Sequence, residues 1–495
     1  MTIINLVIII AIISIVVTGL HHVSRNKISS YFITFLQYFT GILFLFSGWV
    51  KAVDPLGTAF KLQDYFAEFY TTFDGTALSF IAPIFPILSE YSIAFSIFMI
   101  IFEMVLGIML ILGDRPKLTS WLFFLLVVFF TMLTGFTYLT GYVPGDQNFF
   151  NFSAWGPYKI SNMRVTDCGC FGDFILLEPK ISFFKDLFLL IPAFYFIFKS
   201  KLMHQWLDQS KRNTIIWLST ILLIFYCVYN FYWNEPHVDF RPFKNGTNVA
   251  TQKAKEVEAS NAVQILEVVL KNKADGALQT IPFNQYMSNF RDYEGKYEVV
   301  EQIKSQPAMT LTKIFDFQIS DFDGNDVTDT YLTQPEPQFM IVVYKPKYKV
   351  NPEKVTVRDS IFAYDTVMVV GFRDSIQIVK NFKEVTTKEV DSFKIEWDKD
   401  FLSSMMDVVK PLQEKASKAN ITTSIVTSGL DSATAQDLLT ASGISAAIYT
   451  ADEKLLKTIM RSNPGVVLWQ NGVLVQKWHY KKLPSFDNIK STYLK

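Results

Sequence analysis

Two cysteines separated by one glycine are the residues of this chain most suited to chemistry. Cys168 and Cys170 flank Gly169. A disulfide between cysteines this close in sequence closes a small, strained ring, and strain raises its reduction potential. The pair is therefore predicted to perform thiol–disulfide exchange: one thiolate attacks a partner's disulfide and the other cysteine resolves the mixed disulfide.

The neighbouring residues complete this motif and are predicted to support the exchange. Gly169 and Gly172 let the backbone bend and admit a partner chain, and Asp167 and Phe171 occupy the remaining positions. Two alternatives stay open: a static disulfide that staples the loop, or one half of a metal site. The sequence offers few other soft ligands, so no metal ion is expected.

Membrane helices are the elements expected to position these cysteines. Hydrophobic residues make up 50% of the 495-residue chain, and apolar stretches near the length of a bilayer-spanning helix predict six spans, the first of them an anchor. The predicted spans are Ile3 to Leu20, Tyr31 to Val50, Ser92 to Leu112, Ser120 to Leu139, Phe184 to Phe198 and Thr214 to Trp233.

The placement of basic residues predicts the orientation of these spans. The formal net charge is zero, so nothing favours nucleic acid as a partner. Lysine and arginine gather in the odd-numbered connections, which are therefore expected to face the cytoplasm. The cysteine pair and everything after Trp233 then lie on the outer side, which in a bacterium with two membranes is the oxidising periplasm. The basic residues are Arg25, Lys27, Arg115, Lys117, Lys199, Lys201, Lys211 and Arg212.

Three charged residues in or near the spans are further candidates. Pro55 is expected to stop the second span. At that end of the span Lys51 and Asp54 are predicted to pair at the interface, as charges whose side chains reach toward water. Glu103 lies in the middle of the third span, where an ionisable group needs a partner, and Lys51 is the nearest in depth. Glu103 or Lys51 would relay a proton or bind a quinone-like ligand; a satisfied packing contact is the alternative. No cofactor is required.

The membrane part resembles the DoxX and MauE families, which are four-helix bundles. MauE-type members carry the same Cys-Gly-Cys-Phe-Gly run in the same connection, so the motif favours MauE. The resemblance implies periplasmic maturation of disulfide-bearing partners, for MauE the small subunit of methylamine dehydrogenase; DoxX relatives are linked to quinol oxidase. It extends from Tyr31 to Lys199 and rests on Gly48 to Pro55, on Glu103, Gly107 and Gly113, and on Asp167 to Gly172.

The C-terminal part is expected to be an α/β domain. Residues 234–306 form a polar linker in which Ala254 to Lys271 has the spacing of an amphipathic helix. From Met309 onward the pattern is of strands and helices. The expected strands are Ile314 to Ile319 with a partner at Val327, Phe339 to Tyr344, a β-rich segment from Val355 to Lys380 with a turn at Arg373-Asp374, Thr422 to Val426, and a hairpin from Val466 to Trp478 about Asn471-Gly472.

Helices are expected at Trp397 to Ala419, at Ser432 to Ala441 and at Asp452 to Arg461. In the first of these Phe401, Met405, Val408 and Leu412 would form the buried face.

This domain is similar to a thioredoxin-like domain of the TlpA kind. The similarity rests on the strands up to Tyr344, the helix to Ala419, and Ser462 to Gly465 leading into the last hairpin, and Pro464 matches the cis-proline position. Lys345 to Lys349 stands where the family has Trp-Cys-x-x-Cys, and the domain has no cysteine, so it cannot do thiol chemistry. The resemblance implies that Pro464 lies beside an extended bound peptide; a structural lid is the alternative.

Taken together, the sequence predicts a multi-pass protein of the bacterial inner membrane with a periplasmic C-terminal domain. The domains would be an anchor (1–30), a four-helix DoxX/MauE-like core (31–200), one more span (201–233), the linker (234–306) and the thioredoxin-like domain (307–495). The predicted function is accessory disulfide handling or protein maturation, with the lipid bilayer and a periplasmic protein as partners. The competing function is non-catalytic: a membrane scaffold or quinol-oxidase-type subunit whose soluble domain is an interaction module.

Overall fold

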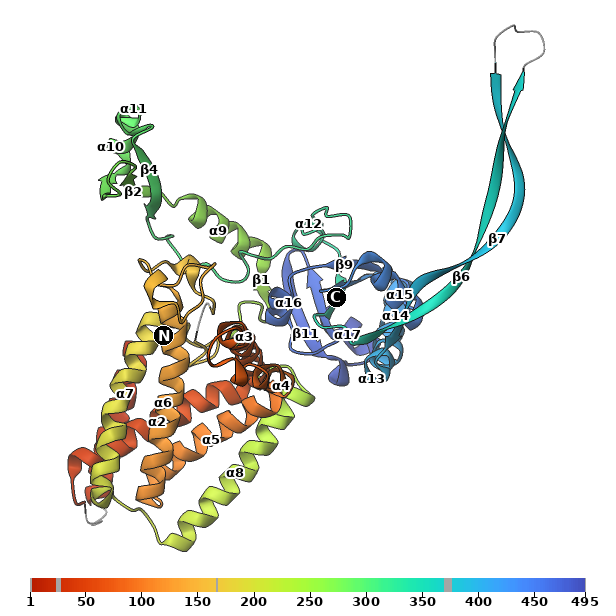
Figure 1. The fold of residues 1–495 in the computed structure, drawn as a ribbon. Coiled ribbons are helices and arrows are strands. Elements are labelled where there is room, and N and C mark those ends of the chain that lie inside the picture. Colours follow the sequence, from red (N-terminus) through yellow and green to blue (C-terminus); the bar gives the residue numbers. More distant parts are fainter. Residues whose placement is uncertain (1, 24–27, 166–167, 369–375, 495) are drawn as a thin grey trace. The chain divides into compact units, whose positions relative to one another are not determined.

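A computed structural model describes residues 2–23, 28–165, 168–368 and 376–494 of the chain (Figure 1). Its contacts separate two compact units, Met1–Lys244 and Asn245–Lys495. The first is helical and the second contains the sheets.

The predicted spans are confirmed in the first unit. Among its described residues, six helices are long and apolar enough to cross a membrane, so the chain is a multi-pass membrane protein. The fifth reaches further toward both ends than the apolar run alone indicates. These helices are α1 (Ile3–Val23), α2 (Tyr31–Val53), α5 (Ser92–Leu112), α6 (Pro116–Thr140), α7 (Pro179–Lys199) and α8 (Gln209–Tyr232).

Two further helices lie between α2 and α5, and the sequence did not predict them. Pro55 stops α2 as expected, but it is also the first residue of α3 (Pro55–Phe73), because proline fits the first turn of a helix. The α4 helix (Ile84–Glu90) follows. Short 3-10 helices in the connections are η1 (Ser79–Ile81), η2 (Phe152–Ala154), η3 (Ile160–Asn162) and η4 (Ser200–Leu202).

Glycines allow α2 and α5 to pack closely. A Cβ atom at Gly41 would lie 2.9 Å from the carbonyl oxygen of Gly107, and one at Gly107 would lie 2.8 Å from that of Gly41. Gly48 lies against the side chain of Met104, and an added Cβ at Gly48 would collide with that side chain. This close crossing, typical of small residues in membrane helices, brings the polar residues of α2 and α5 together.

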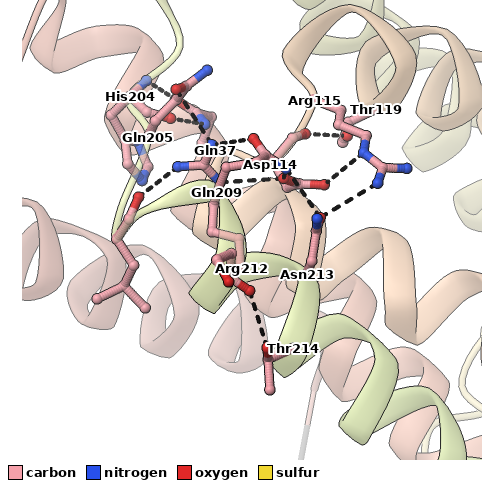
Figure 2. Close-up of polar contacts among 12 residues, drawn as sticks. Gln37, Asp114, Arg115, Thr119, His204, Gln205, Gln209, Arg212, Asn213 and Thr214 are labelled. Atoms are coloured by element: carbon pink, nitrogen blue, oxygen red, sulfur yellow. Dashed lines mark hydrogen bonds and ion pairs between the residues drawn. The ribbon is translucent and has the colours of Figure 1, made fainter.

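A buried ion pair joins the α5–α6 connection to the first turn of α8 (Figure 2). The guanidinium of Arg212 donates to Asp114 Oδ1 at 3.2 Å and to the Leu207 carbonyl oxygen at 2.6 Å. Gln209 also donates to Asp114, at 2.8 Å. Arg212, one of the basic residues used to predict orientation, is thus buried, whereas Arg115, Lys117, Lys199, Lys201 and Lys211 are exposed.

The second unit is built on a mixed sheet with helices packed against it. Among its described residues the sheet has six strands in the order β1-β11-β10-β5-β8-β9; β5, β8 and β9 run parallel and the other pairs antiparallel. The strands are β1 (Thr247–Asn248), β5 (Gln338–Val343), β8 (Thr422–Thr427), β9 (Ala447–Thr450), β10 (Gly465–Gln470) and β11 (Val473–His479).

The three helices predicted after Trp397 are also confirmed, with one change in which residues are buried. The helix after Trp397 contains a π-helical turn, which adds residues to that turn; Val409 rather than Val408 is therefore buried with Met405 and Leu412. The helices are α12 (Asp329–Leu332), α13 (Lys399–Ser404), the π-turn η5 (Met405–Val409), α14 (Lys410–Lys418), α15 (Ser432–Ser442), α16 (Glu453–Ile459), η6 (Tyr480–Lys482) and α17 (Phe486–Tyr493).

One strand prediction and one helix prediction are corrected. The pair expected at Ile314 to Ile319 and Val327 is reduced to a bridge between Ser320 and Asp326, because Asp321 accepts the backbone N–H groups of Asp323 and Asn325 and closes a tight loop. The helix expected over Ala254 to Lys271 ends early: α9 is Val249–Asn261, and the β-branched residues that follow form β2.

Two smaller sheets complete the second unit. The first has the order β3-β2-β4 and carries two short helices. The second is the long antiparallel hairpin of β6 and β7, and its predicted turn at Arg373-Asp374 lies outside the described residues. The elements are β2 (Ile265–Asn272), β3 (Leu278–Pro282), α10 (Phe283–Ser288), α11 (Phe290–Tyr293), β4 (Tyr297–Lys304), β6 (Tyr348–Met368) and β7 (Ile376–Trp397).

Candidate functional site

The cysteine loop lies between α6 and α7 and turns tightly on its two glycines. Gly169 and Gly172 have φ angles of 60° and 49°, in the left-handed region that favours glycine. The Gly172 N–H donates to the Gly169 carbonyl oxygen at 3.1 Å. Cys168 and Cys170 are both thiols and both partly buried. Asp167, the first residue of the predicted motif, lies outside the described residues.

The loop is held against α2 and α3. Ser47 Oγ donates to the carbonyl oxygen of Cys170 at 2.9 Å. A Cβ at Gly169 would lie 3.3 Å from Cγ of Lys61, and one at Gly172 would lie 3.6 Å from Val50. The ring of Phe171 is buried in the core of the bundle. Cys170 is therefore fixed on both sides, by the hydrogen bond to its carbonyl group and by the aromatic residue that follows it.

A buried ion pair lies behind the Ser47 hydrogen bond. Lys51 Nζ contacts both carboxylate oxygens of Glu103, at 2.8 and 3.1 Å, and donates to Ser47 Oγ at 3.1 Å. Lys51 is 6% and Glu103 2% exposed. The predicted partnership of these two residues is confirmed, and a line of polar contacts runs from Glu103 through Lys51 and Ser47 to the backbone of Cys170.

The predicted pairing of Lys51 with Asp54 is wrong, and Lys51 does not reach toward water. Asp54 caps the start of α3 instead, since its carboxylate accepts the Gly57 N–H at 3.1 Å. Lys51 turns inward because the carboxylate of Glu103, which needs a counter-charge at its depth, lies within reach across the α2–α5 crossing.

A second buried pair was missed by sequence reasoning. Lys185 Nζ donates to Asp186, and Thr134 of α6 donates to the other oxygen of that carboxylate at 3.0 Å. Asp186 is 2% exposed. Lys185 Nζ also lies 5.9 Å from the ring centre of Phe171, the neighbour of Cys170. The available signal was a carboxylate inside the apolar run that predicts the fifth span.

Both pairs act electrostatically on the Cys170 thiol. Burial raises the pKa of Cys170 above its usual value, and among the charges Lys185 lowers it most. In each pair the lysine has a larger effect than its carboxylate, since Lys185 outweighs Asp186 and Lys51 outweighs Glu103. The lysines of both pairs therefore offset part of the effect of burial on this pKa.

Other candidate residues stand apart from this group. The peptide bond between Asn463 and Pro464 is cis, just before β10 of the second unit. Ser462 Oγ donates to the Pro464 carbonyl oxygen at 2.5 Å, and Asn463 Nδ2 to that of Lys345 at 2.6 Å. Cys227 is buried between α8 and α5, beside Ile100 and Met104. In the part of the chain that the structure describes, no three His, Cys, Asp or Glu side chains are arranged to hold a metal ion.

Comparison with known proteins finds a match only within the membrane part. No curated protein and no solved structure matches the chain. A match to a family model runs from residue 29 to residue 144, from before α2 to the end of α6. It includes Lys51, Asp54 and Glu103 and ends before the cysteine loop. Over residues 29–144 this membrane protein matches the family described as methylamine utilisation protein MauE.

Proposed function

We propose that this protein is an accessory factor that exchanges disulfides with a partner protein at the outer face of the bacterial inner membrane. The observation that carries the proposal is the anchoring of Cys170: its carbonyl group is fixed by Ser47, and lysines of two buried ion pairs act on its thiol. Reactive cysteines are found where positive charges lie close to a partly exposed thiol, whereas a structural staple needs no charges near it.

The exchange needs only the partner's own sulfur atoms. A thiolate of the partner attacks Sγ of Cys168 in the Cys168–Cys170 disulfide; that bond breaks, its electron pair goes to Cys170, and a mixed disulfide forms. The partner's second thiolate then attacks the partner sulfur that is bonded to Cys168. This attack forms the partner's disulfide and releases Cys168 as a thiolate. The partner is oxidised and the loop reduced, by two electrons, and the reverse sequence reduces a partner's disulfide.

The second unit supplies partner binding in this proposal. It is proposed to be a thioredoxin-like domain without the reactive cysteines, in which the chain beside Pro464 accepts an extended peptide. Support comes from the mixed sheet and from the cis peptide bond at Pro464 that the resemblance implied. The partner class is a periplasmic protein that carries disulfides, as the MauE resemblance implies.

The proposal is tested by trapping the mixed disulfide in cells. With Cys170→Ser, no second thiol resolves the bond between Cys168 and its partner, so partner proteins should be released from the purified chain by reductant. Cys227→Ser is the matched control, because Cys227 is buried in a helix contact and should trap no partner when the loop is intact. A Cys170→Ser chain that carries no reducible partner would support a fixed staple and the scaffold function instead.

A further inference from the structure

The surroundings of Cys170 hold charged groups from four helices. Lys51 comes from α2, Glu103 from α5, and Lys185 and Asp186 from α7. Lys61 of α3 lies against Gly169. Each of the two buried pairs is neutral as a whole, so any effect on a nearby thiolate depends on which member of the pair acts more strongly.

We propose that Lys185 is the positioning residue that stabilises the thiolate of Cys170, and that Asp186 and Thr134 hold it in place. The inference rests on the proposed exchange function and names the residue that assists it. It assigns Cys170 as the sulfur that leaves and returns, and Cys168 as the sulfur that joins the partner.

The placement of Lys185 favours it over Lys51. The ammonium group of Lys51 is committed to both oxygens of Glu103 and to Ser47. Lys185 has one carboxylate partner, lies over the ring of Phe171, and keeps 20% of its side chain exposed. Among the charges, Lys185 lowers the pKa of Cys170 most, although burial raises that pKa overall.

This charge matters in the step that breaks the loop disulfide. When a partner's thiolate attacks Cys168, the electron pair of the broken bond goes to Cys170, which leaves as a thiolate in a partly buried site. Because a nearby cation favours the charged form of a thiol, Lys185 makes Cys170 a better leaving group than it would be without that charge. In the reverse direction the same charge increases the fraction of Cys170 that is present as the thiolate, the form that attacks the mixed disulfide.

Alkylation of Cys170 as a function of pH tests the inference. The full chain carries Cys168→Ser and Cys227→Ser, so that Cys170 is its single thiol, and the rate of reaction with N-ethylmaleimide is measured in detergent. Lys185→Met should move the midpoint of the profile to higher pH, and Asp186→Asn should move it to lower pH, each changing the rate below the midpoint by on the order of threefold to tenfold. Lys185→Arg should resemble the parent.

The opposite signs separate an electrostatic role from a structural one, because damage to the bundle would move both profiles the same way. Lys180→Met is the matched control: this lysine lies in the first turn of α7, is exposed, and should leave the profile unchanged. Profiles that stay in place in Lys185→Met and Asp186→Asn, or that move together, overturn the assignment of Lys185. Because alkylation needs no partner, that result can be told apart from failure of the exchange function, which appears as absence of the trapped partner.

Discussion

At the scale of single residues, the bundle gathers several of its polar side chains beneath one thiol. Lys51 and Glu103 meet across α2 and α5, and Ser47 links them to the carbonyl group of Cys170. Burial of an ion pair costs desolvation, so such pairs contribute little net stability but leave a large penalty when one partner is removed. Their presence near Cys170 suits the proposed role in setting the charge of its thiol.

The Lys51–Glu103 pair is predicted to be coupled. Removing one partner, as in Lys51→Met or Glu103→Leu, should destabilise the membrane unit by about 3–5 kcal/mol because the other charge is left buried. The double variant should regain most of that loss. The measurement is a double-mutant cycle on thermal stability in detergent; additive losses would contradict the coupling.

The pKa of Cys170 gives a second prediction. Because burial raises this pKa, less thiolate is present at a given pH than in an ordinary cysteine. With Cys170 as the single thiol, the alkylation rate should continue to rise with pH beyond the point where the same chain, unfolded in detergent, has levelled off. Coincident profiles for the folded and unfolded chain would contradict the effect of burial.

Residue-level prediction from sequence succeeded where a charge was out of place. Glu103 stood in the middle of an apolar span, so the need for a counter-charge pointed to Lys51. Asp186 gave a similar signal inside the fifth apolar run, but the link of Lys185 and Asp186 to Cys170 depends on how α6, α7 and the loop pack. Ser47 carried no signal, since a serine in a membrane helix usually bonds its own backbone.

At the scale of elements, the α2–α5 crossing places Lys51 opposite Glu103. The crossing relies on Gly41 and Gly107, whose backbones are too close for a side chain. Gly41→Ala or Gly107→Ala should therefore force the helices apart, with a loss of about 1–3 kcal/mol from overpacking. Thermal stability of the purified chain measures this.

Gly19→Ala is the matched control, because Gly19 lies in α1 and an added Cβ there meets nothing within 4 Å. Equal losses at Gly19 and Gly41 would mean that helix flexibility, and not the close crossing, determines the effect.

Element prediction was accurate where one local signal dominated. The six spans follow from apolar length alone, and the last hairpin follows from Asn471-Gly472, both with the positive φ angles of a tight turn. It failed where a helix and a strand share a pattern: Ile265 to Lys271 continues the charge alternation of α9 but is a strand paired with β3 and β4. The π-helical turn at Met405–Val409 could not be predicted from the spacing of apolar residues.

At the scale of the whole molecule, orientation decides whether the cysteine loop meets an oxidising compartment. Exposed basic residues remain in the third and fifth connections even with Arg212 buried. The loop and the second unit are therefore predicted to face outward.

Cysteine labelling tests this orientation in a chain without its native cysteines. A membrane-impermeant maleimide should label Gln436→Cys, on α15 of the second unit, in cells with a permeable outer membrane. It should label Lys117→Cys, in the first turn of α6 beside the α5–α6 connection, only after the inner membrane is opened. Both positions are exposed. The reverse pattern would place the thiols in the cytoplasm, and the proposed exchange would lose its compartment.

The redox state of Cys168 and Cys170 inside cells decides between disulfide exchange and a fixed staple. Cells are quenched with acid, and thiols are tagged with a reagent that adds mass, before and after brief exposure to a mild reductant. An exchanging pair should be present as a disulfide that the mild reductant opens and that forms again when the reductant is removed. A bond that only strong reductant after unfolding can open would contradict the account and identify the pair as a fixed staple.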